Sequence, residues 1–387
     1  MNRYAFKVET GWAGERIPDR NFQSATKSRI ANRRSPFLGL ILLLLPVGGA
    51  LHASEAPVIH VVTTLPDYAS VAKAIGGARV EVEAMVAGNQ NAHFVRPKPS
   101  FAALLGSADV LIETGLDLEM WLPAVVDRAG NPRILSGQAG YVAAARGVAM
   151  LDKPSSVSAG EGDLHVYGNP HITVSPVNIR VVARNVALGM ARADPGGKEL
   201  YEKNLAAFLN DLDERLFGKE LAAMLGGDTL ASLAEQGKLA DFLATKKYKG
   251  KALAEYAGGW WKAMAPLRGA RIVTYHRTWT YFFHLFGLVE AGTLEPKPGI
   301  PPSTRHVADL IETMRKDGVK IVLSENYFSE SDVTNVAEKT GAQAVIVPVY
   351  VGGAPGADDY FKLVDHWVSS LKAAAEKAGA PEKKQGD

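Results

Sequence analysis

Short apolar runs rich in β-branched residues alternate with amphipathic helical segments in two separate stretches of the chain. The run at 58–65 is followed by a helical pattern that ends in two glycines, and then by the run at 80–86. The same alternation resumes at 270–276. Alternating strands and helices predict parallel sheets covered by helices, and therefore an α/β fold. The expected strands are 58–65, 80–86, 108–115, 270–276, 288–295, 319–325 and 342–350.

A long helical stretch separates the two alternating regions. Its first helix ends at the helix-breaking residues 194–197, and its second runs over 198–225 with apolar residues at helical spacing. At 1.5 Å per residue, the second helix would be about 40 Å long. We therefore expect two α/β lobes with mainly parallel sheets, joined by a long rigid helix. The N-terminal lobe is expected at 54–176 and the linking helices at 177–225. An inserted segment is expected at 226–265, the C-terminal lobe at 266–380 and a disordered tail at 381–387.

The residues before the first strand have the pattern of an export signal. Basic residues, among them Arg33 and Arg34, precede an apolar run at 36–50, and the small residue Ala53 follows it. The run is shorter than the ~20 residues that a membrane span needs. We interpret residues 1–53 as a cleaved signal region, with an uncleaved anchor as the alternative. Export of this kind predicts a periplasmic protein.

The composition argues against several kinds of site and partner. The sequence contains no cysteine, so we expect no disulfides, no thiolate ligands and no lipid attached through an N-terminal cysteine. The formal net charge is only +2, which gives no electrostatic reason to expect a nucleic-acid partner. Histidine is therefore the strongest zinc ligand that this chain has.

Histidines lie where the ligands of an α/β sheet bind, beyond the carboxyl ends of strands. His93 follows the strand at 80–86, and His276 ends the strand at 270–276. His171 lies in a loop rich in Gly, Pro and Asn that leads into the long helical stretch. The three side chains could meet in a cleft between the lobes. Three imidazoles with one oxygen ligand are a set that Zn²⁺ favours.

Each of these histidines lies in a motif. NAHFVRPKPS contains His93, GNPHITVSP contains His171, and YHRTWTYFFHLFGL contains His276 as its second residue. They resemble the ligand-bearing motifs of the substrate-binding proteins of zinc and manganese ABC importers, the cluster A-I family. The resemblance runs from about Val58 to Leu371, with 226–262 as an insertion. It implies that the three histidines are metal ligands. Zinc members carry histidine at the third position, where manganese members tend to carry glutamate, so the resemblance favours zinc.

The resemblance leaves the fourth ligand open. Members of the family often supply an aspartate in a loop after the last strand, where this chain has Gly352-Gly353. Glu325, which ends the strand at 319–325, is our first candidate for the missing ligand. A water molecule is the second candidate, and Asp358 or Asp359 would need the loop to fold back.

The other histidines receive different interpretations. His165, on the same loop as His171, is interpreted as a solvated residue or as a neighbour that lies above the metal. We expect His60 to be buried in the first strand and His284 to pack in the core. His306 and His366 lie on amphipathic helices and are expected to face solvent.

The resemblance implies a periplasmic Zn²⁺ receptor that delivers its metal to the membrane permease of an ABC importer. A periplasmic metal donor is a second partner to consider, and we expect a monomer without enzymatic activity. A manganese or iron receptor of the same family is the first alternative. A zinc hydrolase with an activated water is another, although no general-base motif is found. An adhesin-like interaction protein is the last.

Overall fold

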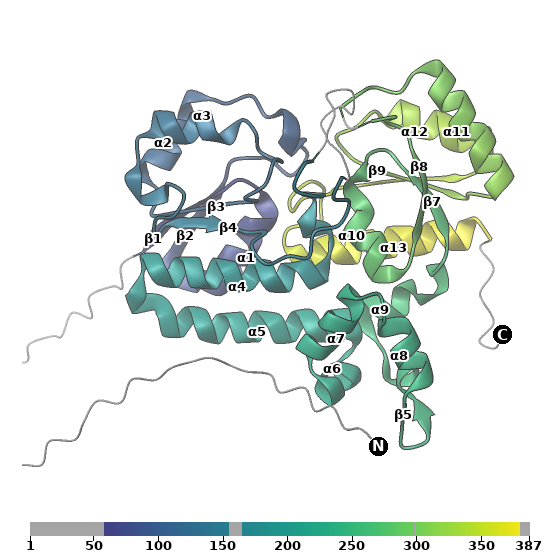
Figure 1. Cartoon of the computed structure of the whole chain (residues 1–387), viewed down its shortest axis with the longest axis horizontal. Coiled ribbons are helices and arrows are strands. Elements are labelled where there is room, and N and C mark those ends of the chain that lie inside the picture. Colours follow the sequence, from purple (N-terminus) through teal and green to yellow (C-terminus); the bar gives the residue numbers. More distant parts are fainter. Residues whose placement is uncertain (1–57, 155–164, 298, 380–387) are drawn as a thin grey trace, which may run out of the picture. The chain divides into compact units, whose positions relative to one another are not determined.

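The computed structural model describes residues 58–154, 165–297 and 299–379, which fold into two lobes (Figure 1). Each lobe is built on a sheet of four parallel strands. The N-terminal sheet has the order β2-β1-β3-β4, formed by Val80–Ala84, Ile59–Thr63, Val110–Glu113 and Tyr141–Ala143. The C-terminal sheet has the order β10-β9-β7-β8, formed by Gln343–Val347, Ile321–Glu325, Arg271–Thr274 and Val289–Thr293. The predicted α/β fold with two parallel-sheet lobes is confirmed.

Helices cover both faces of each sheet (Figure 1). In the N-terminal lobe, α1 (Pro66–Gly76) and α4 (Pro176–Ala193) lie on one face, and α2 (Pro99–Ser107) and α3 (Leu122–Ala129) lie on the other. In the C-terminal lobe, α13 (Tyr360–Lys377) lies on one face, and α11 (Thr304–Asp317) and α12 (Glu330–Thr340) on the other. The remaining α-helices are α5 (Lys198–Phe217), α6 (Lys219–Leu225), α7 (Gly227–Glu235), α8 (Leu239–Thr245), α9 (Gly259–Met264) and α10 (Thr280–Phe286).

One apolar core runs through both lobes. It includes Ile112 on β3, Leu212 on α5 and Trp367 on α13. The rings of Trp279 and Trp367 pack edge to face, with centroids 5.4 Å apart. Helix α5 contacts α1 in the N-terminal lobe and also α9. The helices of the two lobes are therefore connected through α5 and α9, since α9 also contacts α13.

The helix predicted over 198–225 is interrupted in the structure. Helix α5 ends at Phe217, and α6 begins at Lys219. Between them, Gly218 has a φ of +88°, and a Cβ built on it would lie 2.5 Å from the backbone of Gly258. The apolar spacing continues through this point, but the close approach of two backbones requires a turn that only glycine tolerates well. The segment that follows contains α7, α8 and a small hairpin of β5 (Lys247–Tyr248) and β6 (Lys251–Ala252).

None of the described helices combines the length and apolar character that crossing a membrane would require. The predicted signal region at 1–53 and the predicted tail at 381–387 lie outside the described residues.

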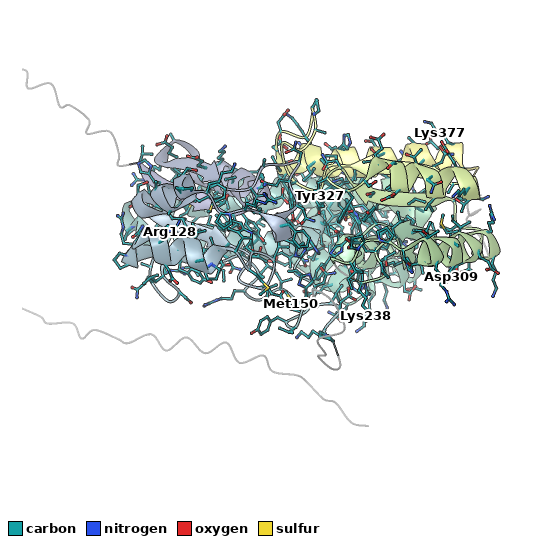
Figure 2. The ribbon with its side chains drawn as sticks, turned by 90° about the horizontal axis from the view of Figure 1, so that it is seen from above. Arg128, Met150, Lys238, Asp309, Tyr327 and Lys377 are labelled. Atoms are coloured by element: carbon teal, nitrogen blue, oxygen red, sulfur yellow. The ribbon has the colours of Figure 1, made fainter. Side chains whose placement is uncertain are left out.

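The lobes also meet near the carboxyl ends of their strands. A Cβ built on Gly88, after β2, would lie 2.3 Å from the backbone nitrogen of Gly353 and 2.4 Å from the carbonyl oxygen of Val351. The Val351 N–H donates a hydrogen bond of 2.8 Å to Oδ1 of Asp67 on α1. Seen from above, Tyr327, after β9, lies in the middle region, with α3 and α11 toward opposite ends (Figure 2). Backbone contacts between the lobes therefore lie at the same edge as the strand ends.

Replacing Gly88 by alanine should destabilise the protein, because the added methyl group would collide with backbone atoms of the opposite lobe. We expect the free energy of unfolding to fall by about 1–3 kcal/mol. The matched control is Gly106→Ala on α2, where the nearest atom to a built Cβ lies 3.7 Å away. Helix propensity should raise the stability of this control by about 0.5–1 kcal/mol. Urea denaturation measures both changes, and equal effects would contradict this role of Gly88.

The pH dependence of stability should weaken when Asp67 is replaced by asparagine. Burial raises the pKa of the Asp67 carboxyl from 3.8 to about 7, in spite of the hydrogen bond from Val351. The folded protein therefore holds a proton that the unfolded chain releases, and this contribution to stability is lost as the pH rises toward the folded-state pKa. Asparagine keeps an acceptor oxygen and cannot ionise.

Between about pH 5 and pH 8, the metal-free wild-type protein should lose about 2 kcal/mol more unfolding free energy than Asp67→Asn. Urea denaturation in the presence of a chelator gives both values. Asp309→Asn, at an exposed position on α11, is the control and should follow the wild type. A variant Asp67→Asn with the wild-type pH dependence would show that this carboxyl does not carry the effect.

Candidate metal centre

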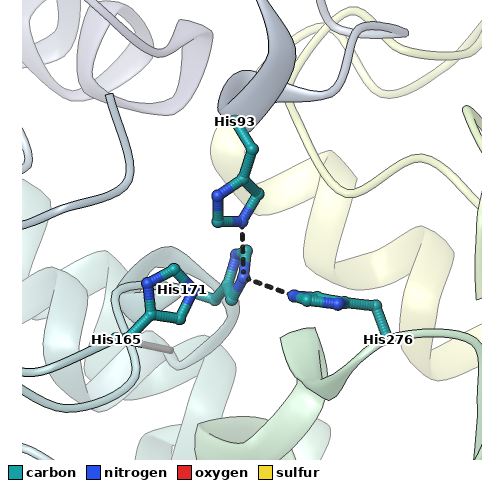
Figure 3. A group of neighbouring side chains, drawn as sticks. All are labelled: His93, His165, His171 and His276. Atoms are coloured by element: carbon teal, nitrogen blue, oxygen red, sulfur yellow. Dashed lines mark hydrogen bonds between the residues drawn. The ribbon is translucent and has the colours of Figure 1, made fainter. Parts of the chain in front are cut away.

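Four histidines direct ring nitrogens toward one point between the two lobes (Figure 3). They are His93, His165, His171 and His276, and one ring nitrogen from each lies within 4.8 Å of those of the others. The Nε2 atoms of His93 and His276 are each 3.2 Å from Nε2 of His171. In a tetrahedral zinc site with bonds of 2.0–2.1 Å, the nitrogens would be about 3.3 Å apart. The spacing fits a site for a single cation.

The strand ends position these side chains. His93 lies on a short 3₁₀ turn after β2, and His276 is the second residue after β7. His171 lies between β4 and α4. The N-terminal lobe thus supplies two of the three histidines predicted from the sequence and the C-terminal lobe supplies the third. The structure brings all three together.

Two asparagines fix the backbone at His93 and His171 in the same way. Oδ1 of Asn91 accepts a hydrogen bond of 3.0 Å from the His93 N–H. Oδ1 of Asn169 accepts one of 3.0 Å from the His171 N–H. The sequence analysis missed these residues, although both motifs share the pattern Asn-x-His, in which the asparagine side chain commonly closes a local turn.

Asn169 also ties the His171 loop to the C-terminal lobe. Its Nδ2 donates a hydrogen bond of 2.7 Å to the carbonyl oxygen of Arg277, next to His276. The Tyr281 hydroxyl on α10 donates one of 2.7 Å to the Asn169 carbonyl oxygen. These bonds join the loops that carry His171 and His276 and so help to set the distance between the two imidazoles.

Carboxylates orient two of the four imidazoles. Nδ1 of His276 lies 2.7 Å from Oε2 of Glu295, which follows β8. Nδ1 of His165 lies 3.0 Å from Oδ1 of Asp117, which follows β3. A proton held on Nδ1 leaves the lone pair on Nε2, and metal-binding histidines are generally oriented in this way. The sequence analysis missed both carboxylates, although Glu295 ends one predicted strand and Asp117 comes two residues after another.

The environment of His93 and His171 favours neutral imidazoles. Burial lowers the pKa of His93 well below its usual value, and the nearby His276 and His165 lower it further. Burial also lowers the pKa of His171, followed by the effects of His93 and His276. A neutral imidazole has the free lone pair that a metal needs.

Glu325 lies outside the group of four histidines, in contrast to its predicted place as fourth ligand. Its side chain is fully buried, and burial raises the pKa of its carboxyl to about 8. Neither carboxyl oxygen has a hydrogen-bond partner among the described residues. The groups that lower its pKa are on Thr278 and Trp279, which come just after His276 in the chain. The carboxyl therefore belongs to the packed interior beside the cluster.

The other two candidates for the fourth ligand also lie elsewhere. Asp359 caps the start of α13 by accepting a hydrogen bond from the Lys362 N–H. Asp358 is exposed and forms an ion pair with Lys362. Helix capping and surface pairing account for both carboxylates.

Several expectations for the remaining histidines are wrong. His60 is exposed, although its neighbours Ile59 and Val61 on β1 are buried, and it lies 3.7 Å from Glu81 on the adjacent strand β2. His284 is exposed on α10, and its Nε2 lies 2.8 Å from the carbonyl oxygen of Glu235. His306 and His366 are partly buried rather than turned fully to solvent.

Comparisons with known proteins identify similar sequences and folds. The family model of the periplasmic zinc-uptake complex component A, ZnuA, matches residues 61–216 and 228–374. The manganese ABC transporter substrate-binding lipoprotein PsaA of Streptococcus mitis is 24% identical over 318 residues, covering 81% of this chain and 85% of PsaA. The iron ABC transporter substrate-binding lipoprotein MtsA of Streptococcus pyogenes serotype M1 is 26% identical over 182 residues, covering 46% of this chain and 56% of MtsA. A crystal structure of a zinc-bound ZnuA deletion mutant has a TM-score of 0.60 and 23% identity, covering 82% of this chain and 98% of that one.

Replacing Glu295 by glutamine should weaken metal binding, because the neutral amide holds the His276 ring less firmly and makes it less basic. We expect the affinity for a divalent cation to fall by about 10-fold or more. Competition with a chelating dye of known affinity measures the change. Glu312→Gln, at an exposed position on α11, should bind as the wild type does. Equal affinities in all three proteins would show that Glu295 does not orient a ligand.

Proposed function

The chain belongs to the zinc-uptake complex component A family of metal-binding proteins of ABC transporters, and from this we propose that it is a receptor for Zn²⁺ bound by His93, His171 and His276. The observation that carries the proposal is the convergence of three Nε2 atoms from both lobes, with two separations of 3.2 Å. Histidines that meet at this spacing repel one another if protonated, so a bound cation gives a physical reason for the arrangement.

The donor atoms support zinc as the cargo. Within the described residues, the group of four contains only histidines. Imidazole nitrogen suits Zn²⁺ well, whereas Mn²⁺ prefers carboxylate, carbonyl and water oxygens. Glu325 is not part of the proposed ligand set, because it lies outside this group and its carboxyl is held in the packed interior.

The arrangement suits capture and delivery. Substrate-binding proteins of ABC importers work with a membrane permease and an ATPase, and we propose that this receptor hands its metal to such a permease. His276 comes from one lobe and His93 and His171 from the other, so a small relative movement would separate the ligands. The shared core favours release by modest tilting and loop movement over wide opening. We propose a periplasmic location, in line with the expected signal region at 1–53.

A manganese or iron receptor is the second candidate, because PsaA and MtsA are named as transporters of those metals. The two candidates share the fold, the partners and the position of the site. They differ in the metal that binds tightly when both are offered, which is a direct experimental question. The matched family consists of transport proteins, so it gives no support to the zinc-hydrolase alternative.

Calorimetric titration of the metal-stripped protein should reveal one tight Zn²⁺ site that excess Mn²⁺ does not weaken. His171→Ala should reduce the zinc affinity by at least about 100-fold, or about 3 kcal/mol, because it removes the central ligand. His60→Ala changes an exposed histidine outside the cluster and should bind as the wild type does. Tight Mn²⁺ or Fe²⁺ binding together with weak zinc binding would show that manganese or iron, and not zinc, is the cargo. A protein without any tight metal site would refute the receptor.

A further inference from the structure

We propose that His165 is the fourth ligand of the metal, positioned by Asp117, and that the resulting set of four imidazoles selects Zn²⁺ over Mn²⁺. This inference rests on the proposed function and names the feature that sets its metal preference. It assigns the fourth place to a side chain of the N-terminal lobe, on the loop that also carries His171.

The first argument is an unpaired nitrogen. Nε2 of His165 is buried and has no hydrogen-bond partner in the part of the chain that the structure describes. A ring nitrogen of the same residue lies within 4.8 Å of those of the other three histidines. Leaving a buried polar atom unpaired costs about 1–3 kcal/mol, so such atoms usually have a partner. A metal at the centre of the cluster would supply that partner.

The second argument is that the His165 ring is held on several sides. Oδ1 of Asp117 lies 3.0 Å from its Nδ1, and Oδ2 accepts a hydrogen bond of 3.1 Å from the Val166 N–H. One carboxylate thus holds both the ring and the adjacent backbone. The ring also stacks on that of His93, with centroids 5.1 Å apart and an interplanar angle of 24°. A histidine that merely met solvent would not need three such contacts.

The third argument concerns where the negative charge lies. Four imidazoles are neutral donors, so they leave the double charge of the cation in place. Asp117 in one lobe and Glu295 in the other each lie against Nδ1 of a clustered histidine. Two carboxylates behind the rings would balance the cation without touching it and would make both rings stronger donors.

This arrangement has a consequence for selectivity. A cation that prefers oxygen gains no carboxylate ligand from the cluster, whereas Zn²⁺ binds well to four nitrogen or sulfur donors in a tetrahedron. In the proposed site, His165 supplies a nitrogen as the fourth ligand, in place of the oxygen expected from Glu325. The ratio of zinc to manganese affinity should therefore depend on His165.

The test is X-ray absorption spectroscopy of the zinc-loaded protein, combined with zinc and manganese affinities from competition titrations. The variants are His165→Ala, Asp117→Asn and, as a control on the same loop, Tyr167→Ala, whose side chain is 63% exposed. Circular dichroism of the metal-free proteins checks that each variant is folded.

The wild-type spectrum should show four imidazoles and no carboxylate ligand. His165→Ala should show three, with a zinc affinity about 10- to 100-fold lower and a correspondingly lower zinc-to-manganese ratio. Asp117→Asn should keep four imidazoles but lose about 10-fold in affinity, as expected of a positioning residue. Tyr167→Ala should match the wild type.

An oxygen ligand with three imidazoles in the wild-type protein would overturn the assignment of His165, and so would an unchanged spectrum in His165→Ala. Either result could accompany tight zinc binding, and the proposed receptor function would then stand. If the wild-type protein showed neither tight zinc binding nor an imidazole signal, the proposed receptor function itself would be refuted.

Discussion

The parallel pairing of every strand in both sheets is the constraint on which the candidate site depends. Parallel strands end at one edge of their sheet, so the loops that follow them emerge side by side. His93, Asp117, His276 and Glu295 all follow strands in this way. Because the two sheets share a core and the helices of their lobes are connected through α5 and α9, their edges meet. Side chains that are far apart in the sequence therefore reach a single point.

Most of the fold could be predicted from the sequence, because apolar runs and helical spacing are local signals. The break at Gly218 could not be predicted, because it depends on a contact with another segment of the chain. The strand Tyr141–Ala143 could not be predicted either, because three residues are too few to form a pattern. In the site, the strand-end rule located His93 and His276, and loop composition located His171. The same rule also selected Glu325, whose burial outside the cluster no local pattern records. The sequence left the position of His165 open, because that position depends on Asp117, 48 residues away.

Carboxyl groups with little exposure to solvent fall into two kinds in this protein. Burial is the main reason that the pKa of Glu119 rises to about 7 and that of Glu325 to about 8. These two buried carboxyls carry less negative charge near neutral pH than exposed ones do. Asp117 and Glu295 instead contact imidazole nitrogens directly. The hydrogen-bond partner thus separates the carboxyls that contact the histidines from those that are only buried.

The backbone contact between Gly88 and Gly353 limits how this chain could change. A Cβ on Gly353 would lie 2.4 Å from the carbonyl oxygen of Gly88, and a Cβ on Gly88 would lie 2.3 Å from the Gly353 nitrogen. Neither position can gain a side chain while the other keeps its place, so the two are locked together. The resembled family often carries an aspartate close to Gly353. In this chain, that part of the loop makes close backbone contacts with the other lobe. A loop without such contacts can more easily supply an additional ligand.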